Sequence, residues 1–417
     1  MDSTAPLEDT SPPESVPLLR NGNFQALWIS RTFAAIGKEA ADVAYPLLIL
    51  ATTGSAMYAG AVGSVQVLTV GLVSIPAGSL ADRFDRRKLL LACDVVRAVL
   101  LALFGVLILL GQSNIFFVFT TAIISSACLG ISNPPALAAI KQLVPPSQLT
   151  RATAQNQIRP LGATVVGSPI GTSLFGLGQA IPFLGTALTF VISAPLLLFI
   201  KRPMQPPATA SGSRGGMVAG IRLIRREPII LVWTIWILGA NMAFGHTGAF
   251  LAVIATGKSH GASDPLIGAA LSIAGCGGLV GALFATWAIK RLRPSTILLF
   301  AAWVGPVVAI LLITLPGTLT QGILLAVVFV RGPVANALFF AYVAVLVPDE
   351  LQGRVLGAVM FAAYIGPTIG IFAVGSLFDL GGPTWVFVAM GVISALAALP
   401  TLTRRIRKLP APEQLAA

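Results

Sequence analysis

GSLADRFDRRK, residues 78–88, is the stretch that decides the fold class of this chain. Six of its eleven residues are charged, in a protein in which only 10% of all residues are charged. One apolar run precedes it from about Met57, and another begins at Leu89. Apolar runs of membrane-spanning length lie in lipid, whereas a dense cluster of charges must lie in water. The stretch therefore predicts a short loop between two transmembrane helices.

The composition extends this prediction to the whole chain. Its 417 residues are 56% hydrophobic with a mean hydropathy of +0.88, whereas soluble domains contain about 25% charged residues. At about 20 to 25 residues per span, roughly twelve helices with short loops fit the length. The net charge of +12 would suit nucleic acid, but the basic residues cluster between apolar runs, which favours contact with the membrane surface. We expect an all-α integral membrane protein with no nucleic-acid partner.

The sequence offers little for catalysis, metal binding or a cofactor. Cys93, Cys128 and Cys276 all fall inside apolar segments, and the two histidines, His246 and His260, are too few for a metal cluster. No Walker sequence is present, so ATP is not the expected energy source. No arrangement of nucleophile and base is visible. We expect neither an enzyme nor a bound metal or cofactor.

Twelve apolar segments are predicted to span the membrane. Six lie at 24–51, 57–81, 88–111, 115–140, 149–178 and 181–200, and six at 228–256, 264–289, 295–315, 319–346, 354–379 and 383–403. They divide the chain into a disordered cytoplasmic tail (1–23), an N-terminal six-helix bundle (24–200), a cytoplasmic linker (201–227), a C-terminal six-helix bundle (228–403) and a cytoplasmic tail (404–417).

The basic residues predict the orientation of these spans. Most of the 27 Lys and Arg residues fall in alternate loops, including 83–88, 201–226 and 404–408, whereas the opposite set of loops contains only Lys258. Positive charge concentrates on the cytoplasmic side of membrane proteins. We therefore expect a multi-pass protein of the cell membrane with both termini in the cytoplasm.

The two halves of the chain repeat one another. LVPPSQLTR at 143–151 is similar to LVPDELQGR at 346–354, and Asn133 and Asn336 have the same separation as these two stretches. Each half contains six spans, so both copies enter the membrane in the same orientation. Parallel repeats of this kind place a substrate site between the halves near the bilayer midplane.

Charges inside the first span are the main candidates for chemistry. Arg31, Lys38 and Asp42 fall within about 40° of each other around a helix, and Glu39 lies within about 80° of them. An ionisable group at the bilayer centre costs about 2.5 to 3.5 kcal/mol, so this stripe must avoid lipid. It is either an ion cluster that holds the helix against its neighbours or a site for protons or substrate. In the second case Glu39 or Asp42 would carry the proton.

Other intramembrane charges are candidates with weaker signals. Arg159 and Arg331 each need a counter-charge or water, and contact with the substrate cavity is one of the two interpretations for each. Asp94 and Arg97 have i,i+3 spacing, which favours a local pair, with a role in the cytoplasmic gate as the alternative. His246 is expected to pack between helices.

Two spans contain glycine–proline motifs. The fifth span has Gly167, Pro169 and Gly171, and the eleventh has Gly366, Pro367 and Gly370. Small residues allow close packing of membrane helices, whereas proline removes a helical hydrogen bond and can bend the helix. Packing is the simpler interpretation, and a bend that helps the halves rock is the alternative.

Three stretches resemble drug and siderophore exporters of the major facilitator superfamily, especially the enterobactin exporter type; macrolide-efflux transporters share the outline. The stretches are 78–88, AGIRLI at 219–224 and LVPDELQGRVLG at 346–357. The resemblance implies the twelve-helix fold of two parallel six-helix repeats. It also implies alternating access, proton-coupled export of a small amphipathic compound, and action as a monomer.

The resemblance further implies a cytoplasmic gate in which Asp82 meets the start of the eleventh helix near Arg354. The residues expected to form this gate are Gly78, Asp82, Arg83, Arg86, Arg87, Asp94, Arg97 and Arg354. An anion against a helix N-terminus with a guanidinium nearby would supply the attraction.

The chain departs from the family pattern at several positions. Asp85 stands where many relatives have glycine, and the fourth span, around 125–130, lacks the arginine of many proton-coupled drug exporters. The basic turn at 290–293 in the second half has no aspartate, with Ile289 in its place. Two alternatives therefore stay open: an importer or uniporter of a small solute, and a membrane receptor or scaffold that transports nothing.

Overall fold

The computed structural model describes residues 17–202, 204, 217–407 and 409–415, and within these ranges the regular structure is helical. The first bundle contains α1 (Gly22–Thr53), α2 (Ala56–Arg83), α3 (Arg86–Leu109), α4 (Ile115–Leu143), α5 (Leu149–Leu177) and α6 (Ile181–Leu198). The second contains α8 (Pro228–Phe244), α9 (His246–Ser259), α10 (Asp264–Arg291), α11 (Pro294–Thr314), α12 (Thr318–Leu346) and α13 (Asp349–Ala398). Shorter helices are η1 (Leu18–Arg20), η2 (Pro146–Gln148), α7 (Met217–Arg226), η3 (Leu399–Leu402), α14 (Arg404–Arg407) and α15 (Pro412–Leu415).

These helices correspond to twelve membrane spans. The helices α8 and α9 form one span that is interrupted at Gly245, and α13 forms two spans because its backbone is non-helical at Gly381 and Gly382. Gly382 has φ +71°, a left-handed conformation that glycine adopts without a Cβ clash. Within the described residues, nine segments are long and apolar enough to cross a membrane, and the last of them contains both spans of α13.

The two remaining spans, α1 and α5, have membrane-spanning length but are less apolar. They pack against each other inside the first bundle, where a Cβ at Gly171 would lie 2.4 Å from the Ala40 carbonyl oxygen. Their polar residues therefore face protein and cavities instead of lipid, which is the arrangement that the cost of intramembrane charge demands.

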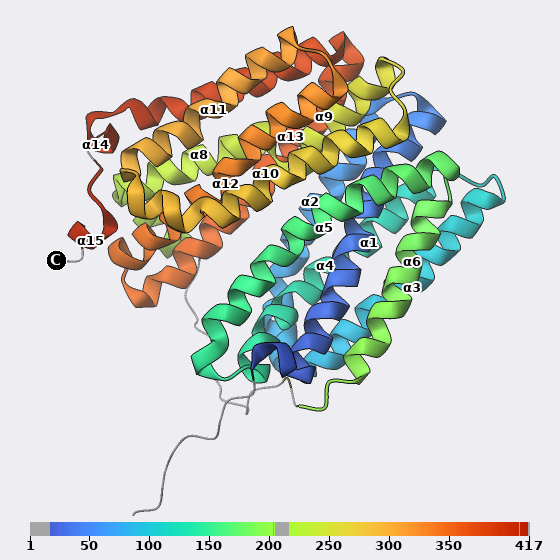
Figure 1. Ribbon diagram of the computed structural model, residues 1–417, viewed down its shortest axis with the longest axis horizontal. Coiled ribbons are helices and arrows are strands. Elements are labelled where there is room, and N and C mark those ends of the chain that lie inside the picture. The colour runs from blue at the N-terminus through green and yellow to red at the C-terminus, as the bar shows by residue number, and fades with distance from the viewer. Residues whose placement is uncertain (1–16, 203, 205–216, 408, 416–417) are drawn as a thin grey trace, which may run out of the picture.

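The two bundles lie side by side, with α2 and α5 of the first next to α10 and α13 of the second (Figure 1). The α5–α10 contact includes the Ser272 hydroxyl, which donates to the Val165 carbonyl at 2.5 Å. The α2–α13 contact brings Gly60 against Ile371 and Gly375. These contacts lie toward the end of the molecule opposite the chain termini. At the terminal end, a Cβ added at Gly78 or Gly353 would meet nothing within 4 Å.

The predicted spans agree with the helices, but the segments outside them are more ordered than expected. Residues 1–16 of the predicted N-terminal tail lie outside the described residues, whereas Leu18 is buried and the Asn21 side chain caps α1. Part of the predicted linker forms α7, in which Ile224 packs into the core of the second bundle. Ile406 and Leu409 of the C-terminal tail are also buried. These stretches are ordered because their few apolar side chains pack against the end of a bundle.

The glycine–proline motifs pack helices together. Gly167 lies against Glu39 of α1, and Gly370 lies against the Met242 carbonyl of α8. Both α5 and α13 continue as helices through the motifs, and the interruption of α13 comes later, at Gly381 and Gly382. The structure therefore shows close helix packing at these glycines, and the bend stays a prediction.

Candidate functional site

Three cavities lie close together: α1 lines two of them, and the third is next to them along α5, where Pro160 lines one cavity and Leu161 lines another. The aromatic cavity, about 240 Å³, is lined by Trp236, Phe244, His246, Phe329 and Arg331 among others. The central cavity, about 230 Å³, is lined by residues including Lys38, Asp42, Arg97, Thr247 and Tyr364. The basic cavity, about 300 Å³, is lined by residues including Arg31, Lys38, Glu39, Arg97 and Arg159.

The central and basic cavities adjoin because Lys38, Arg97 and Asn133 line both of them. Asn336 of the second bundle, the counterpart of Asn133 in the sequence repeat, lines the aromatic cavity. Residues of both bundles therefore face the same region, as expected for a substrate site between two repeats.

Lys38 forms ion pairs with two carboxylates in this region. Its Nζ lies 2.5 Å from an Asp42 carboxylate oxygen and 3.1 Å from Glu39 Oε1. The side chains of Lys38 and Asp42 are 29% and 21% exposed, so both face cavity space. One ammonium group thus serves two carboxylates, and the site retains a negative charge that a proton can neutralise.

Glu39 also connects the two bundles. Its Oε2 lies 3.5 Å from Nε2 of His246, which is the first residue of α9 directly after the interruption at Gly245. Neither atom has a hydrogen-bond partner among the described residues, so this is a close approach of the two groups and not a formed hydrogen bond. The His246 ring also lies 4.1 Å from the Phe250 ring. His246 therefore does more than pack between helices, because it also approaches Glu39 of the other bundle.

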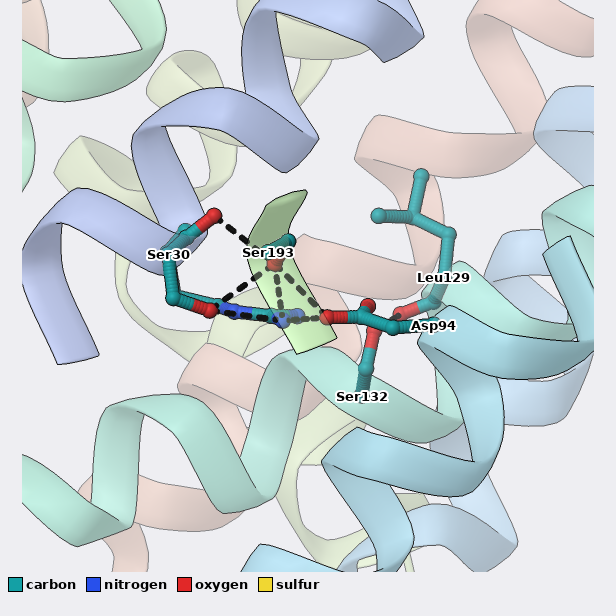
Figure 2. A network of polar contacts seen from close by, with 6 residues as sticks. Ser30, Asp94, Leu129, Ser132 and Ser193 are labelled. Carbon is teal, nitrogen blue, oxygen red and sulfur yellow. Dashed lines mark hydrogen bonds and ion pairs between the residues drawn. The ribbon is translucent and has the colours of Figure 1, made fainter. Parts of the chain in front are cut away.

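Arg31 belongs to a different network, between α1, α3 and α6. Its guanidinium is paired with Asp94 and donates to the hydroxyls of Ser30 and Ser193. The Ser193 hydroxyl lies 2.7 Å from the Asp94 carboxylate, and Figure 2 shows Ser193 between Ser30 and Asp94. The ion-paired side chains are only 7% and 1% exposed. This network joins three helices.

The prediction of a local pair between Asp94 and Arg97 is wrong, because Asp94 pairs with Arg31 from another helix. Arg97 instead donates from Nε to the Ser125 hydroxyl at 3.1 Å and lies 4.1 Å from the centre of the Phe190 ring. The i,i+3 spacing was misleading because the two side chains leave α3 toward different neighbours.

Arg159 and Arg331 come from opposite bundles and line different cavities. Arg159 of α5 lines the basic cavity, and its Nε has no hydrogen-bond partner among the described residues. Arg331 of α12 lines the aromatic cavity, donates to the Ala301 carbonyl at 2.9 Å and lies 5.7 Å from the rings of Trp236 and Phe244.

The predicted gate residues are only partly brought together. The Asp82 side chain lies outside the described part of the structure. Arg86 donates to the Met204 carbonyl at 3.0 Å, in the segment after α6, and Arg87 donates to the carbonyl of Leu198, the last residue of α6. Arg354 lies against α7, where a Cβ at Gly220 would come within 2.3 Å of its carbonyl oxygen. Arg83 is exposed at the end of α2.

A second contact between the bundles, at Asp379, was missed by sequence reasoning. The Asp379 carboxylate of α13 accepts hydrogen bonds from the backbone N–H groups of Ala56 and Met57, at 2.8 and 3.0 Å, and from the Ser55 hydroxyl at 2.5 Å. It therefore caps the N-terminus of α2 in the other bundle, where an anion is favoured. The available signal was one aspartate just before the turn between two spans, which is too common to identify a partner.

Comparison with known proteins agrees with this architecture. A family model described as Major Facilitator Superfamily matches residues 27–341. The "Multidrug efflux pump Tap" of Mycolicibacterium fortuitum is 25% identical over 410 residues, which cover 94% of this chain and 98% of that protein. The "Enterobactin exporter EntS" of Salmonella typhimurium is 25% identical over 400 residues, which cover 93% and 94%.

Solved structures share the fold at low sequence identity. The nucleoside transporter NupG aligns with a TM-score of 0.71 and 12% identity, over 91% of this chain and 97% of that one. A D-xylose–proton symporter aligns with a TM-score of 0.69 and 13% identity, over 94% and 97%. With its family match over most of the chain, its repeated bundles and its central cavities, the chain belongs to the major facilitator superfamily of membrane transporters.

Proposed function

We propose that this transporter exports a small amphipathic compound, such as a drug, an antibiotic or a siderophore, in exchange for protons. The relatives named as a multidrug efflux pump and an enterobactin exporter support export, because each aligns over nearly the whole chain. In this proposal the protein acts as a monomer in the cell membrane, with both termini in the cytoplasm.

The observation that carries the proposal is the group formed by Lys38, Glu39 and Asp42. Two carboxylates share one ammonium group, and Glu39 approaches His246 of the other bundle. Adding a proton to Glu39 removes one charge from a low-dielectric site and changes its attraction to both neighbours. Because one neighbour belongs to the other bundle, the protonation state of Glu39 affects how the two bundles meet.

Alternating access supplies the movement in this proposal. The bundles pack together at the end opposite the termini, through Asp379 and the α2–α13 and α5–α10 contacts. In the opposite state, Asp82 would approach Arg354 and close the cytoplasmic end. Bending at Pro169 and Pro367 would accompany this rocking of the two halves.

The proposal is tested with protein reconstituted into liposomes under an imposed proton gradient. Efflux of tetracycline, erythromycin and a catechol siderophore is measured together with proton movement. We expect the double variant Glu39→Gln, Asp42→Asn to lose gradient-driven transport. The control is Glu227→Gln, since Glu227 makes no side-chain cap to α8. Gradient-driven efflux that survives in the double variant would remove these carboxylates from the coupling site.

The same assay separates the alternatives. The fold is shared with a D-xylose–proton symporter, so the gradient is imposed in both directions. Substrate movement in the same direction as protons would establish an importer, and movement independent of the gradient would establish a uniporter. A receptor or scaffold would move none of the compounds in either direction.

A further inference from the structure

The charges around the three cavities are unequal in number. In the described part of the chain, five cationic side chains line them: Arg31, Lys38, Arg97, Arg159 and Arg331. Glu39 and Asp42 are the acidic residues that line the same cavities, and Asp94 lies behind Arg31. With His246 neutral, the region carries an excess of positive charge.

Pairing the charges shows where the excess lies. Arg31 is neutralised by Asp94, and Lys38 is neutralised by Glu39 and Asp42. These pairs use every carboxylate in the region. Arg97, Arg159 and Arg331 have no carboxylate within ion-pairing distance among the described residues.

Each of the three remaining guanidinium groups has donors left over. A guanidinium group has five N–H donors, whereas Arg97 uses Nε for Ser125 and Arg331 uses one terminal nitrogen for Ala301. Arg97 and Arg331 are only 4% and 6% exposed. A cation without a counter-ion is expensive at membrane depth, so an anion that entered the cavities would relieve this cost.

The surroundings of these guanidinium groups also determine what kind of anion fits. Arg97 and Arg159 both line the basic cavity, which offers a charged end. Trp236, Phe244 and Phe329 line the aromatic cavity, which offers flat apolar walls beside Arg331. A compound bound across these two cavities would place its charge in the basic cavity and its rings in the aromatic cavity.

We infer that the transporter selects an organic anion with an aromatic body, whose acidic group is held by Arg97 and Arg159. Guanidinium groups bind carboxylate, sulfonate and phenolate oxygens through paired N–H donors. The aromatic body packs against Trp236, Phe244 and Phe329, and Arg331 stacks on the same walls. A cationic compound of the same shape is repelled by all three arginines. This inference rests on the proposed function for the direction of transport but not for the binding site.

The test compares two dyes with the same xanthene ring system and opposite charge. The sulfonate groups of sulforhodamine B give it a net negative charge, whereas tetramethylrhodamine ethyl ester has a net positive charge. Binding of each dye to purified transporter is measured by fluorescence polarisation. We expect the anion to bind more tightly. Loss of a charged hydrogen-bonding partner should weaken anion binding by about tenfold or more in Arg159→Gln.

The matched control is Arg293→Gln, which removes the same charge from an exposed position before α11. It should leave the affinity for both dyes unchanged. Arg97→Gln should repeat the effect of Arg159→Gln. Because Arg97 is buried, Arg159→Gln provides the decisive comparison if the Arg97 variant fails to fold. Tighter binding of the cation, no binding of the anion, or equal anion binding by Arg159→Gln and Arg293→Gln would overturn the inference.

A further measurement keeps this inference separate from the proposed function. Sulforhodamine B keeps its negative charge across the range from pH 5 to 8, roughly the interval in which histidine and perturbed carboxylates titrate. Anion binding that depends on Arg159 but tightens in acid would contradict proton exchange and support the anion site. Proton-driven efflux of the cationic dye alone would support export and overturn the anion site.

Discussion

The charged residues of α1 are held in two different ways. Arg31 is enclosed by Asp94, Ser30 and Ser193, and its side chain is only 7% exposed. Lys38 is 29% exposed, faces two cavities and neutralises carboxylates on its own helix. An ion pair whose partners lie on different helices holds those helices together, whereas a charged group that faces a cavity can exchange protons or contact substrate. The single stripe in the sequence therefore contains one structural ion pair and one candidate coupling group.

Asp94→Asn tests the structural ion pair. It would leave the buried Arg31 guanidinium without its counter-charge, and breaking one partner of a buried pair costs about 3 to 5 kcal/mol. The melting temperature of the purified protein in detergent, followed by tryptophan fluorescence, should fall sharply. Ser193→Ala, which removes a hydroxyl bound to Asp94, should lower it less. A melting temperature of Asp94→Asn equal to that of the wild type would show that the pair does not stabilise the bundle.

Glycine determines how closely α10 and α12 approach each other. A Cβ at Gly277 would lie 2.1 Å from the Ala326 carbonyl oxygen, and one at Gly281 would lie 2.2 Å from that of Val330. A Cβ at Gly322 of α12 would lie 2.4 Å from the Ala270 carbonyl oxygen of α10. Lipid offers little hydrophobic drive for helix association, so close backbone packing of small residues supplies it instead. This contact fixes α12, and with it Arg331, beside the aromatic cavity.

Gly281→Ala tests this helix contact with a single added methyl group. The clash is with backbone, so the helices must separate, and overpacking of this kind costs about 1 to 3 kcal/mol. We expect a lower melting temperature and less folded protein on size-exclusion chromatography. Gly332→Ala is the matched control on α12, since a Cβ there meets nothing within 4 Å. Equal stability of the two variants would contradict the packing account.

The two bundles are joined by groups that come from opposite halves of the chain. Asp379 of the second bundle caps α2 of the first, and Glu39 of the first approaches His246 of the second. The first contact lies at the end opposite the termini and the second lies at the cavities. A change in either contact alters how the halves are arranged, which is the degree of freedom that alternating access uses.

Asp379→Asn should open the end of the molecule opposite the termini. The amide keeps an acceptor but loses the negative charge at the α2 N-terminus, an effect worth about 1 kcal/mol or less. We expect a several-fold rise in the population with that end open. Spin labels at two exposed positions, Thr53 and Leu380, would report this opening as a longer distance between the labels in double electron–electron resonance.

The control for this measurement is Asp85→Asn, since Asp85 caps α3 within its own bundle. The distance between the labels should not change in this variant. A distribution that also stays the same in Asp379→Asn would show that the cap does not hold the bundles together.

The membrane class, the twelve spans and the two-repeat plan could all be predicted from the sequence. Each of these depends on a local signal. A run of about 20 apolar residues can be recognised without knowing any tertiary contact, and the charges of residues 78–88 are enough to predict a loop. The same reasoning recognised that α1 cannot face lipid, because four charges inside one span are incompatible with it.

The partners of the charged residues could not be predicted from the sequence. Sequence spacing favoured Arg97 as the partner of Asp94, three residues away, but the partner is Arg31, 63 residues away. The approach of Glu39 to His246 and the cap by Asp379 likewise join residues from different bundles. Spacing along a helix shows which side chains share a face, whereas the packing of helices determines what that face contacts. The partners in the site therefore became visible only once the helices were placed in space.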